Sequence, residues 1–166
     1  MEVLDEYEIS TFVHAVVYVD RDGFRRYRAV EPPLGEEEAA TLRRLKAAIQ
    51  NVREVRDGVL KLARERRVEY LEELAKRAAS EFKIRVDERA WRKVMYYLRR
   101  DLLGYGKLDP LFADPFIEDI HVDGPGSVWI WHARWESLRT DITLSEEELD
   151  AYVQRLSSLV GKPVSY

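Results

Sequence analysis

The side chains of this chain that could support acid–base or metal chemistry are three histidines and two adjacent acids. His121 and His132 each stand beside apolar residues, and together with His14 they show no carboxylate–histidine spacing typical of a zinc site. We therefore interpret His121 and His132 as structural strand residues. Glu118 and Asp119 are neighbours on a predicted strand, so they point to opposite faces and cannot form an acid–base pair. We expect them to cap backbone amides or to pair with arginine.

A phosphate-binding loop would make the chain an ATPase, and this motif is absent from the sequence. The pattern is Gly-x-x-x-x-Gly-Lys-Ser/Thr, in which backbone N–H groups cradle phosphates and the hydroxyl holds magnesium. Gly161-Lys162 comes nearest, but no glycine stands five positions earlier, and Pro163 replaces the hydroxyl residue. Gly161 is better interpreted as a helix stop. A Walker B aspartate after an apolar strand is also missing, so the chain alone is not expected to hydrolyse ATP.

Composition narrows the class of protein further. The chain has 166 residues, 46% of them hydrophobic, and a formal net charge of −4. This charge argues against general nucleic-acid binding, which needs a concentrated basic surface. The absence of cysteine excludes disulfides and cysteine-ligated zinc. No apolar run of about 18 residues is present, and the acidic start does not resemble a secretory signal. We expect a cytoplasmic protein.

Two groups of side chains could contact a partner. Trp129 and Trp131 share one face of a predicted strand, and such a pair usually belongs to a core or an interface. A basic face is formed by Arg92, Lys93, Arg99, Arg100 and Lys107. It could meet acidic protein groups, anionic lipid or nucleic acid, but a solvated helix side is the simpler interpretation.

Periodicity and turn residues predict an α+β fold: an N-terminal β-hairpin, a three-helix region, and a small antiparallel sheet packed with a C-terminal helix. Strands are expected within Tyr7–Val30 and over Phe116–Val122, Ser127–Ala133 and Leu138–Ile142. Helices are expected over Glu36–Asp57, Val59–Phe82, Asp87–Leu103 and Ser145–Val160. The corresponding domain ranges are 1–35, 36–104 and 105–166.

Local signals support these boundaries. Asp87 is a predicted N-cap, and Ser145 with Glu148 forms a predicted capping box. Gly23 is expected to take a positive φ in a hairpin turn. The seam between the hairpin and the helices is expected near Pro32, because proline cannot donate to a strand ladder.

The segment between the third predicted helix and the following strand is rich in residues that end helices and form turns. Gly104 and Gly106 can take the positive φ that ends a helix. Asp109-Pro110 and Asp114-Pro115 are expected turns, because proline fixes φ and aspartate bonds its own backbone. Ile117, Ile120 and Val122 are the apolar members of the alternation that follows.

This series of helix-ending and turn residues resembles a segment in the N-terminal domains of ATPases of the type II/type IV secretion superfamily. The shared pattern is Arg-Asp-x-x-Gly-Tyr-Gly-x-Leu-Asp-Pro-Leu-x-x-Asp-Pro-x-Ile-Glu-Asp-Ile, and Tyr27–Pro33 is similar to an element of archaeal members that drive pilus and archaellum assembly. The resemblance covers Tyr7–Tyr166 and is strongest over Arg100–Ile142. Its motif positions, with structural roles, are Gly104, Gly106, Asp109, Pro110, Asp114, Pro115, Glu118 and Asp119.

The resemblance implies a coupling domain of a hexameric motor. ATP and magnesium would be held by a C-terminal ATPase domain that this chain does not contain. Arg134 and Arg139 match the region from which basic residues reach the nucleotide phosphates across the domain cleft, as a planar guanidinium suits phosphate. Surface arginines paired with Glu136 or Asp141 are the alternative. The implied partners are the ATPase domain, further copies of the chain and a polytopic platform protein at the inner face of the cell membrane.

Two other functions stay open at this stage. A free-standing adaptor could have kept this domain without the motor. A nucleic-acid binder could use the tryptophans and the basic helix face, although the acidic balance opposes it.

Overall fold

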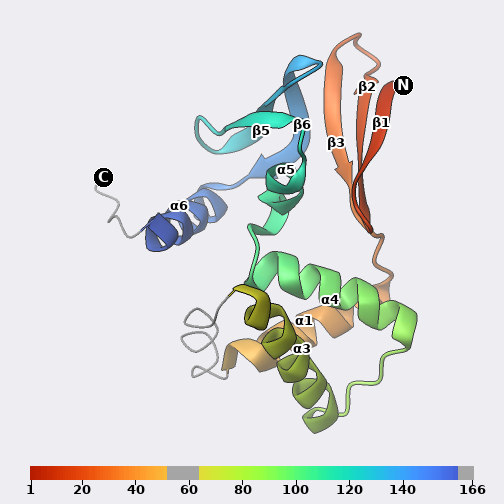
Figure 1. Ribbon diagram of the computed structural model, residues 1–166, viewed down its shortest axis with the longest axis vertical. Coiled ribbons are helices and arrows are strands. Elements are labelled where there is room, and N and C mark those ends of the chain that lie inside the picture. The colour runs from red at the N-terminus through yellow and green to blue at the C-terminus, as the bar shows by residue number, and fades with distance from the viewer. Residues whose placement is uncertain (52–63, 161–166) are drawn as a thin grey trace. The chain divides into compact units, whose positions relative to one another are not determined.

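The computed structural model describes residues 1–51 and 64–160, and its class is α+β, as expected (Figure 1). The strands are β1 Glu2–Ser10, β2 Val13–Val19, β3 Arg25–Val30, β4 Ile117–His121, β5 Gly126–His132 and β6 Glu136–Leu144. The α-helices are α1 Glu36–Asn51, α3 Arg64–Glu81, α4 Glu88–Leu102, α5 Asp109–Ala113 and α6 Glu146–Val160, and a 3-10 turn, η1, spans Gly106–Leu108. None of these helices combines the length and the apolar character that a bilayer crossing requires.

The chain divides into two compact units. A helical unit spans Pro32–Gly106, and a sheet unit combines Met1–Glu31 with Lys107–Tyr166. The seam expected near Pro32 therefore coincides with a unit boundary. The ranges 1–35 and 105–166, which we treated as separate, contribute strands to one sheet.

The sheet has the strand order β1-β2-β3-β6-β5-β4. Neighbouring strands are antiparallel except β3 and β6, which pair in parallel through Arg26 with Arg139 and Tyr27 with Thr140. The later strands form the expected antiparallel part, and the N-terminal strands extend it into a mixed sheet. This pairing covers an edge that each half alone would leave open.

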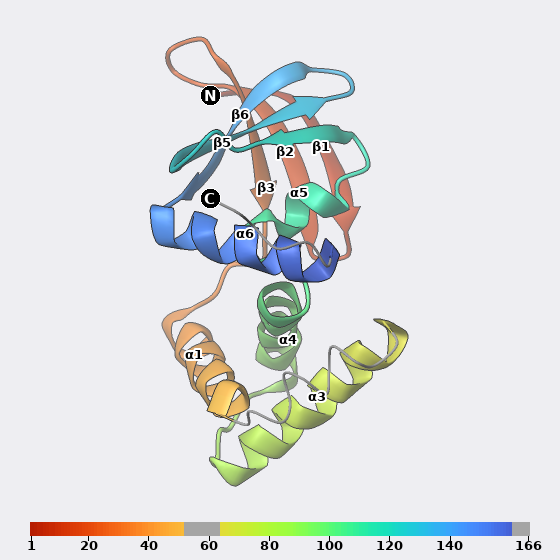
Figure 2. The same ribbon diagram turned by 90° about the vertical axis from the view of Figure 1, so that its left-hand side faces the viewer.

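Alternation along the strands gives the sheet one buried face. Val17, Tyr27, Ile130 and Leu138 are fully buried on this inner face. The short helix α5 lies against it and buries Leu111 (Figure 2). The outer face carries the intervening residues, many of them charged.

The helical unit has its own apolar core, formed by one side each of α1, α3 and α4. The largest fully buried side chains in it are Leu45, Leu71 and Leu98. The helix expected from Val59 is described only from Arg64, and the expected ends at Gly58 and Gly161 lie outside the described residues.

The predicted caps are confirmed. Asp87 accepts a bond from the N–H of Ala90 at 2.8 Å. Ser145 and Glu148 bond each other's backbone N–H groups reciprocally, at 3.2 and 3.0 Å. These motifs were predictable because all their partners lie within three residues.

The glycine predictions are confirmed in part. Gly23 and Gly106 have φ values of 83° and 57°. Gly104 is not among the positive-φ glycines: α4 ends at Leu102, and its C-cap Leu103 keeps a right-handed conformation and bonds the carbonyl of Arg99 through its N–H. The prediction of a positive φ at Gly104 is wrong.

Candidate functional site

The segment that contains Gly104, Gly106 and the two Asp-Pro pairs leads from the end of α4 into the sheet. Asp109-Pro110 does not make a simple turn as expected, because Pro110 occupies the first turn of α5, where its missing N–H costs nothing. Asp114 does make the expected turn: its Oδ1 accepts the N–H of Phe116 at 2.8 Å. This bond reverses the chain and aims it into β4.

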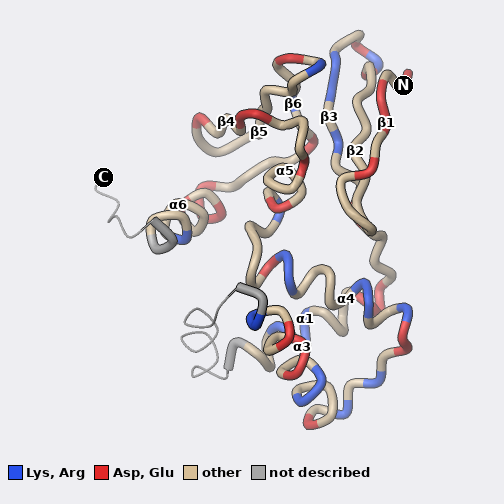
Figure 3. Tube along the Cα trace, viewed as in Figure 1, with Lys and Arg blue, Asp and Glu red and all other residues tan. Residues whose placement is uncertain are grey.

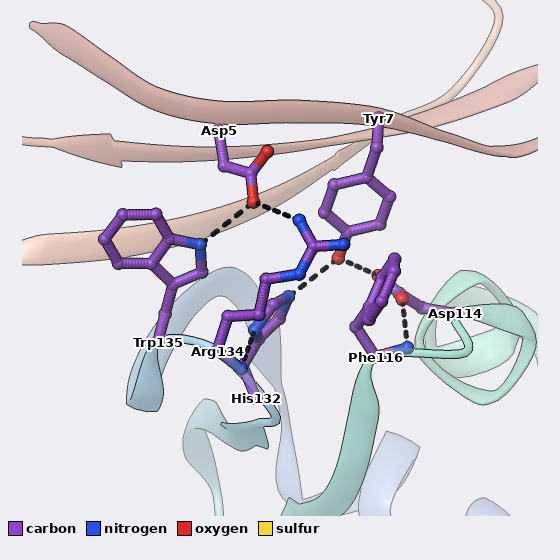
Figure 4. A network of polar contacts seen from close by, with 7 residues as sticks. All are labelled: Asp5, Tyr7, Asp114, Phe116, His132, Arg134 and Trp135. Carbon is purple, nitrogen blue, oxygen red and sulfur yellow. Dashed lines mark hydrogen bonds and ion pairs between the residues drawn. The ribbon is translucent and has the colours of Figure 1, made fainter.

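Asp114 is the centre of a buried polar network. It is 3% exposed, and its Oδ2 accepts hydrogen bonds from the hydroxyls of Tyr7 at 2.7 Å and Tyr27 at 2.6 Å. One carboxylate therefore links β1, β3 and the α5–β4 turn. Figure 4 shows the part of this network around Tyr7 and Asp114.

His132 extends the network to β5. Its Nδ1 accepts the N–H of Arg134 at 3.1 Å, so Nε2 carries the proton of the neutral ring and donates to the Tyr7 oxygen at 2.9 Å. The Tyr7 hydroxyl is then free to donate to Asp114. Burial lowers the pKa of His132 and raises the pKa of Tyr7 and of Tyr27, so the neutral forms are favoured.

This arrangement is a network of mutually satisfied polar groups that links the strands of the sheet. No buried side-chain nitrogen or oxygen in the part of the chain that the structure describes lacks a partner. His132 is fully buried and stacks on Phe116, with ring centroids 5.9 Å apart. His132 is thus a buried residue of β5 with both ring nitrogens bonded, which agrees with its interpretation as a strand residue.

Arg134 lies in the β5–β6 turn at the rim of this network (Figure 4). Its Nη1 is 3.2 Å from Asp5 Oδ2, and its guanidinium lies 4.1 Å from the centre of the Phe116 ring. Trp135 Nε1 donates to the same Asp5 oxygen at 3.0 Å. Arg134 is thus a paired surface arginine. Its partner is Asp5, whereas the alternative interpretation named Glu136 or Asp141.

Arg139 has a different environment, on the outer face of the sheet. Its neighbours along β6, Leu138 and Thr140, are buried, so alternation turns its side chain outward. Its Nε donates to Ser127 Oγ at 3.0 Å, and within residues 1–51 and 64–160 its guanidinium has no carboxylate partner. Asp141 pairs instead with Arg28 at 2.8 Å.

Two tryptophans accompany Arg139 on the outer face. Trp129 stands opposite Arg139 in the β5–β6 ladder, and Trp131 follows on the same side of β5. They are 43% and 42% exposed. Aromatic and arginine side chains are the types most enriched where proteins bind partners. We call Trp129, Trp131 and Arg139 the outer-face cluster.

The structure therefore does not bring Arg134 and Arg139 to one point. Arg134 is held by Asp5 on the side of the buried network, whereas Arg139 belongs to the opposite face. No pattern in the sequence pointed to Asp5, Tyr7 or Tyr27, which lie more than 80 residues from their partners.

Asp119, another motif position, makes local contacts. Asp119 Oδ1 accepts the N–H of Ile120 at 3.0 Å, as the capping interpretation predicted, and Asp119 also lies 3.6 Å from His121 Nε2. Among the described residues, no group of three or more His, Asp or Glu side chains is arranged to hold a metal ion.

Comparison with known proteins finds relatives without assigned function. The chain is 31% identical to the uncharacterized protein MJ1288 of Methanocaldococcus jannaschii over 98% of its own length and 66% of that protein. It is 43% identical to the uncharacterized protein MJ0900 of the same organism, over 53% of this chain and 16% of that protein. No family model matches the chain. It therefore spans 66% and 16% of the lengths of these relatives.

Proposed function

We propose that this chain is the N-terminal coupling domain of a secretion, pilus or archaellum assembly ATPase. The proposal rests on the sequence resemblance around the Gly104–Ile120 motif. It is supported by the way in which the motif folds: η1, α5 and the Asp114 turn follow one another directly and lead into β4.

The outer-face cluster is the observation that carries the mechanism. A coupling domain needs an exposed surface that meets a second domain, while its opposite face holds the fold together. Among the described residues, no carboxylate pairs with the Arg139 guanidinium on this face. This guanidinium would contact the phosphates of an ATP molecule that a separate ATPase domain binds together with magnesium. Phosphate contact would stabilise domain closure, and hydrolysis would release it.

Assembly follows from the same proposal. Six copies would form a cytoplasmic ring peripheral to the inner face of the cell membrane, docked on a polytopic platform protein. The domain would transmit motion and would perform no bond chemistry, consistent with the absence of a phosphate loop from the sequence.

The reading frame beyond Tyr166 gives the first test. A phosphate loop and a Walker B strand are expected there, and an open reading frame without them would contradict the proposal. In the protein that carries them, Arg139→Ala is expected to lower the ATPase rate about tenfold to a hundredfold, because a charge-assisted contact is worth about 1.5–3 kcal/mol.

Two variants control this measurement. Arg21→Ala removes an exposed arginine from the β2–β3 turn and should leave turnover unchanged. Arg134→Ala should have a smaller effect than Arg139→Ala, since its guanidinium is already paired with Asp5. Equal turnover in wild type and Arg139→Ala would remove the assignment of Arg139.

The exposed tryptophans also favour a second candidate, a free-standing adaptor that binds another protein through the outer-face cluster. Its test is capture of a soluble partner by the wild-type chain but not by Trp129→Ser. A reading frame that ends at Tyr166 would favour this candidate over the first.

A further inference from the structure

The helical unit carries the positive charge of the chain. Residues 32–106 contain 18 Lys and Arg against 13 Asp and Glu, a net charge of +5, whereas the sheet unit has 9 against 18, a net charge of −9. Basic positions recur along the connection between α3 and α4 and along α4 (Figure 3). Such segregation indicates an anionic partner for the basic part.

The connection begins with an unusual lysine. Lys83 N–H bonds the carbonyl of Ser80, and Ile84 N–H bonds that of Ala79, which together form a Schellman motif at the end of α3. Lys83 occupies the left-handed position of this motif, with φ 51°. Glycine is the residue that adopts this conformation without strain. Lys83 is therefore less stable at this position than glycine would be.

Further cations follow on α4. Arg89 and Arg92 are exposed and three residues apart, so they lie on one side of the helix, away from the buried Val94 and Leu98. Arg85 precedes them and is also exposed. Within the described ranges none of these three arginines has a carboxylate partner, and like charges at this spacing destabilise a helix.

An exposed apolar side chain precedes Lys83 in the same connection. Phe82 is 52% exposed, and the Arg44 guanidinium donates to its carbonyl oxygen at 3.4 Å. Carboxylates are in the minority: Asp87 is engaged as the N-cap of α4, which leaves Glu81 and Glu88. We call Phe82, Lys83, Arg85, Arg89 and Arg92 the basic corner.

We propose that the basic corner binds an anionic phospholipid surface, with Phe82 entering the interfacial region and the cations contacting lipid phosphates. Exposed cations that accompany an exposed aromatic residue in one stretch of chain suit a membrane interface, where both kinds of side chain find partners. Nucleic acid would use the cations but would leave Phe82 without an apolar partner. The inference stands on the helical unit alone and does not depend on the ATPase assignment.

Co-sedimentation of the full chain with lipid vesicles tests the inference. Binding is expected to phosphatidylcholine vesicles that contain phosphatidylglycerol, to weaken with added salt, and to be absent with phosphatidylcholine alone. Arg89→Gln and Arg92→Gln should each weaken partitioning about fivefold, since a basic residue near an anionic surface contributes about that factor. Arg21→Gln, the same charge change in the sheet unit, should leave binding unchanged.

Lys83→Gly separates a binding role from a structural one. It should raise the folding equilibrium constant about fivefold by removing left-handed strain, and it should weaken vesicle binding. Phe82→Ser should weaken binding without changing its salt dependence. A lysine with a merely structural role would give lower stability on substitution and unchanged binding.

Three results would overturn the proposal. The first is equal binding of all corner variants and wild type to anionic vesicles. The second is no binding of the wild-type chain at low salt. The third is tighter binding to oligonucleotides than to vesicles, with the same corner variants impaired, which would make nucleic acid the partner. None of these readouts depends on ATPase activity.

Discussion

The sheet unit and the helical unit are stabilised in different ways. The centre of the sheet unit contains a polar network in which Asp114, Tyr7, Tyr27 and His132 satisfy one another. The core of the helical unit is formed by apolar side chains such as Leu45, Leu71 and Leu98. The two units should therefore respond differently to the same kinds of perturbation.

The difference follows from directionality. Apolar packing scales with buried area and tolerates small adjustments of neighbouring helices. A buried polar network is directional, and removing one member leaves the other members desolvated without partners. The sheet unit should therefore be sensitive to single polar changes, whereas the helical unit should be sensitive to lost volume.

The largest effect is expected from Asp114→Ala. It removes the shared acceptor of two buried tyrosine hydroxyls and the bond that closes the turn before β4. We expect the free energy of unfolding to fall by about 4 kcal/mol, because each buried donor left unpaired costs about 1–3 kcal/mol. Urea denaturation measures this change.

Paired changes distinguish the network from simple packing. Tyr7→Phe in the Asp114→Ala background should cost less than Tyr7→Phe alone, since the hydroxyl has then already lost its acceptor. Additive effects of the two substitutions would show that Asp114 and Tyr7 do not act as a network, and the contrast between the units would fail.

Leu98→Ala makes the corresponding test in the helical unit. Leu98 is fully buried, so its truncation should cost about 3 kcal/mol through lost burial and a cavity. Hydrogen exchange resolved by segment should show the loss of protection mainly in α1, α3 and α4. A loss of the same size in β2 and β6 would mean that the two units unfold as one, which contradicts the division drawn here.

Local features of the fold were predictable from sequence, because their determinants are close together in the chain. The Asp87 cap, the Ser145–Glu148 box and the Asp114 turn each involve partners within three residues. The same rules could not decide between Gly104 and Gly106, since either glycine can end a helix, and only Gly106 takes the positive φ.

Long-range pairings were not predictable. The alternation in β3 and β6 indicates strands but does not name the partner, so the parallel pairing of Arg26 with Arg139 was missed. Asp5 carries no signal that it will pair with Arg134, 129 residues away. The two arginines of the candidate site were therefore identified from sequence. Their placement on opposite faces was not predictable, because it depends on the sheet topology.

The smallest effect is expected from pH, and in the sheet unit it involves the buried ring of His132. Burial lowers the pKa of His132, so the folded state binds this proton less readily than the unfolded chain does. Its contribution to stability is therefore present above the unfolded value of about 6.5 and is lost as pH falls below it, at no more than about 1.4 kcal/mol per pH unit. Asp114, Asp5 and Glu118 oppose this shift and make it smaller.

The tyrosines give the opposite sign at alkaline pH. Burial and the Asp114 bond raise the pKa of Tyr7 and of Tyr27, so their contribution is complete below about pH 10 and is lost above it. Protection of β1 and β3 measured by hydrogen exchange should therefore fall at both ends of the pH range. His132→Gln should remove the acid-side loss that this residue causes and leave the alkaline loss intact. An unchanged acid slope in this variant would assign the sensitivity to the carboxylates instead.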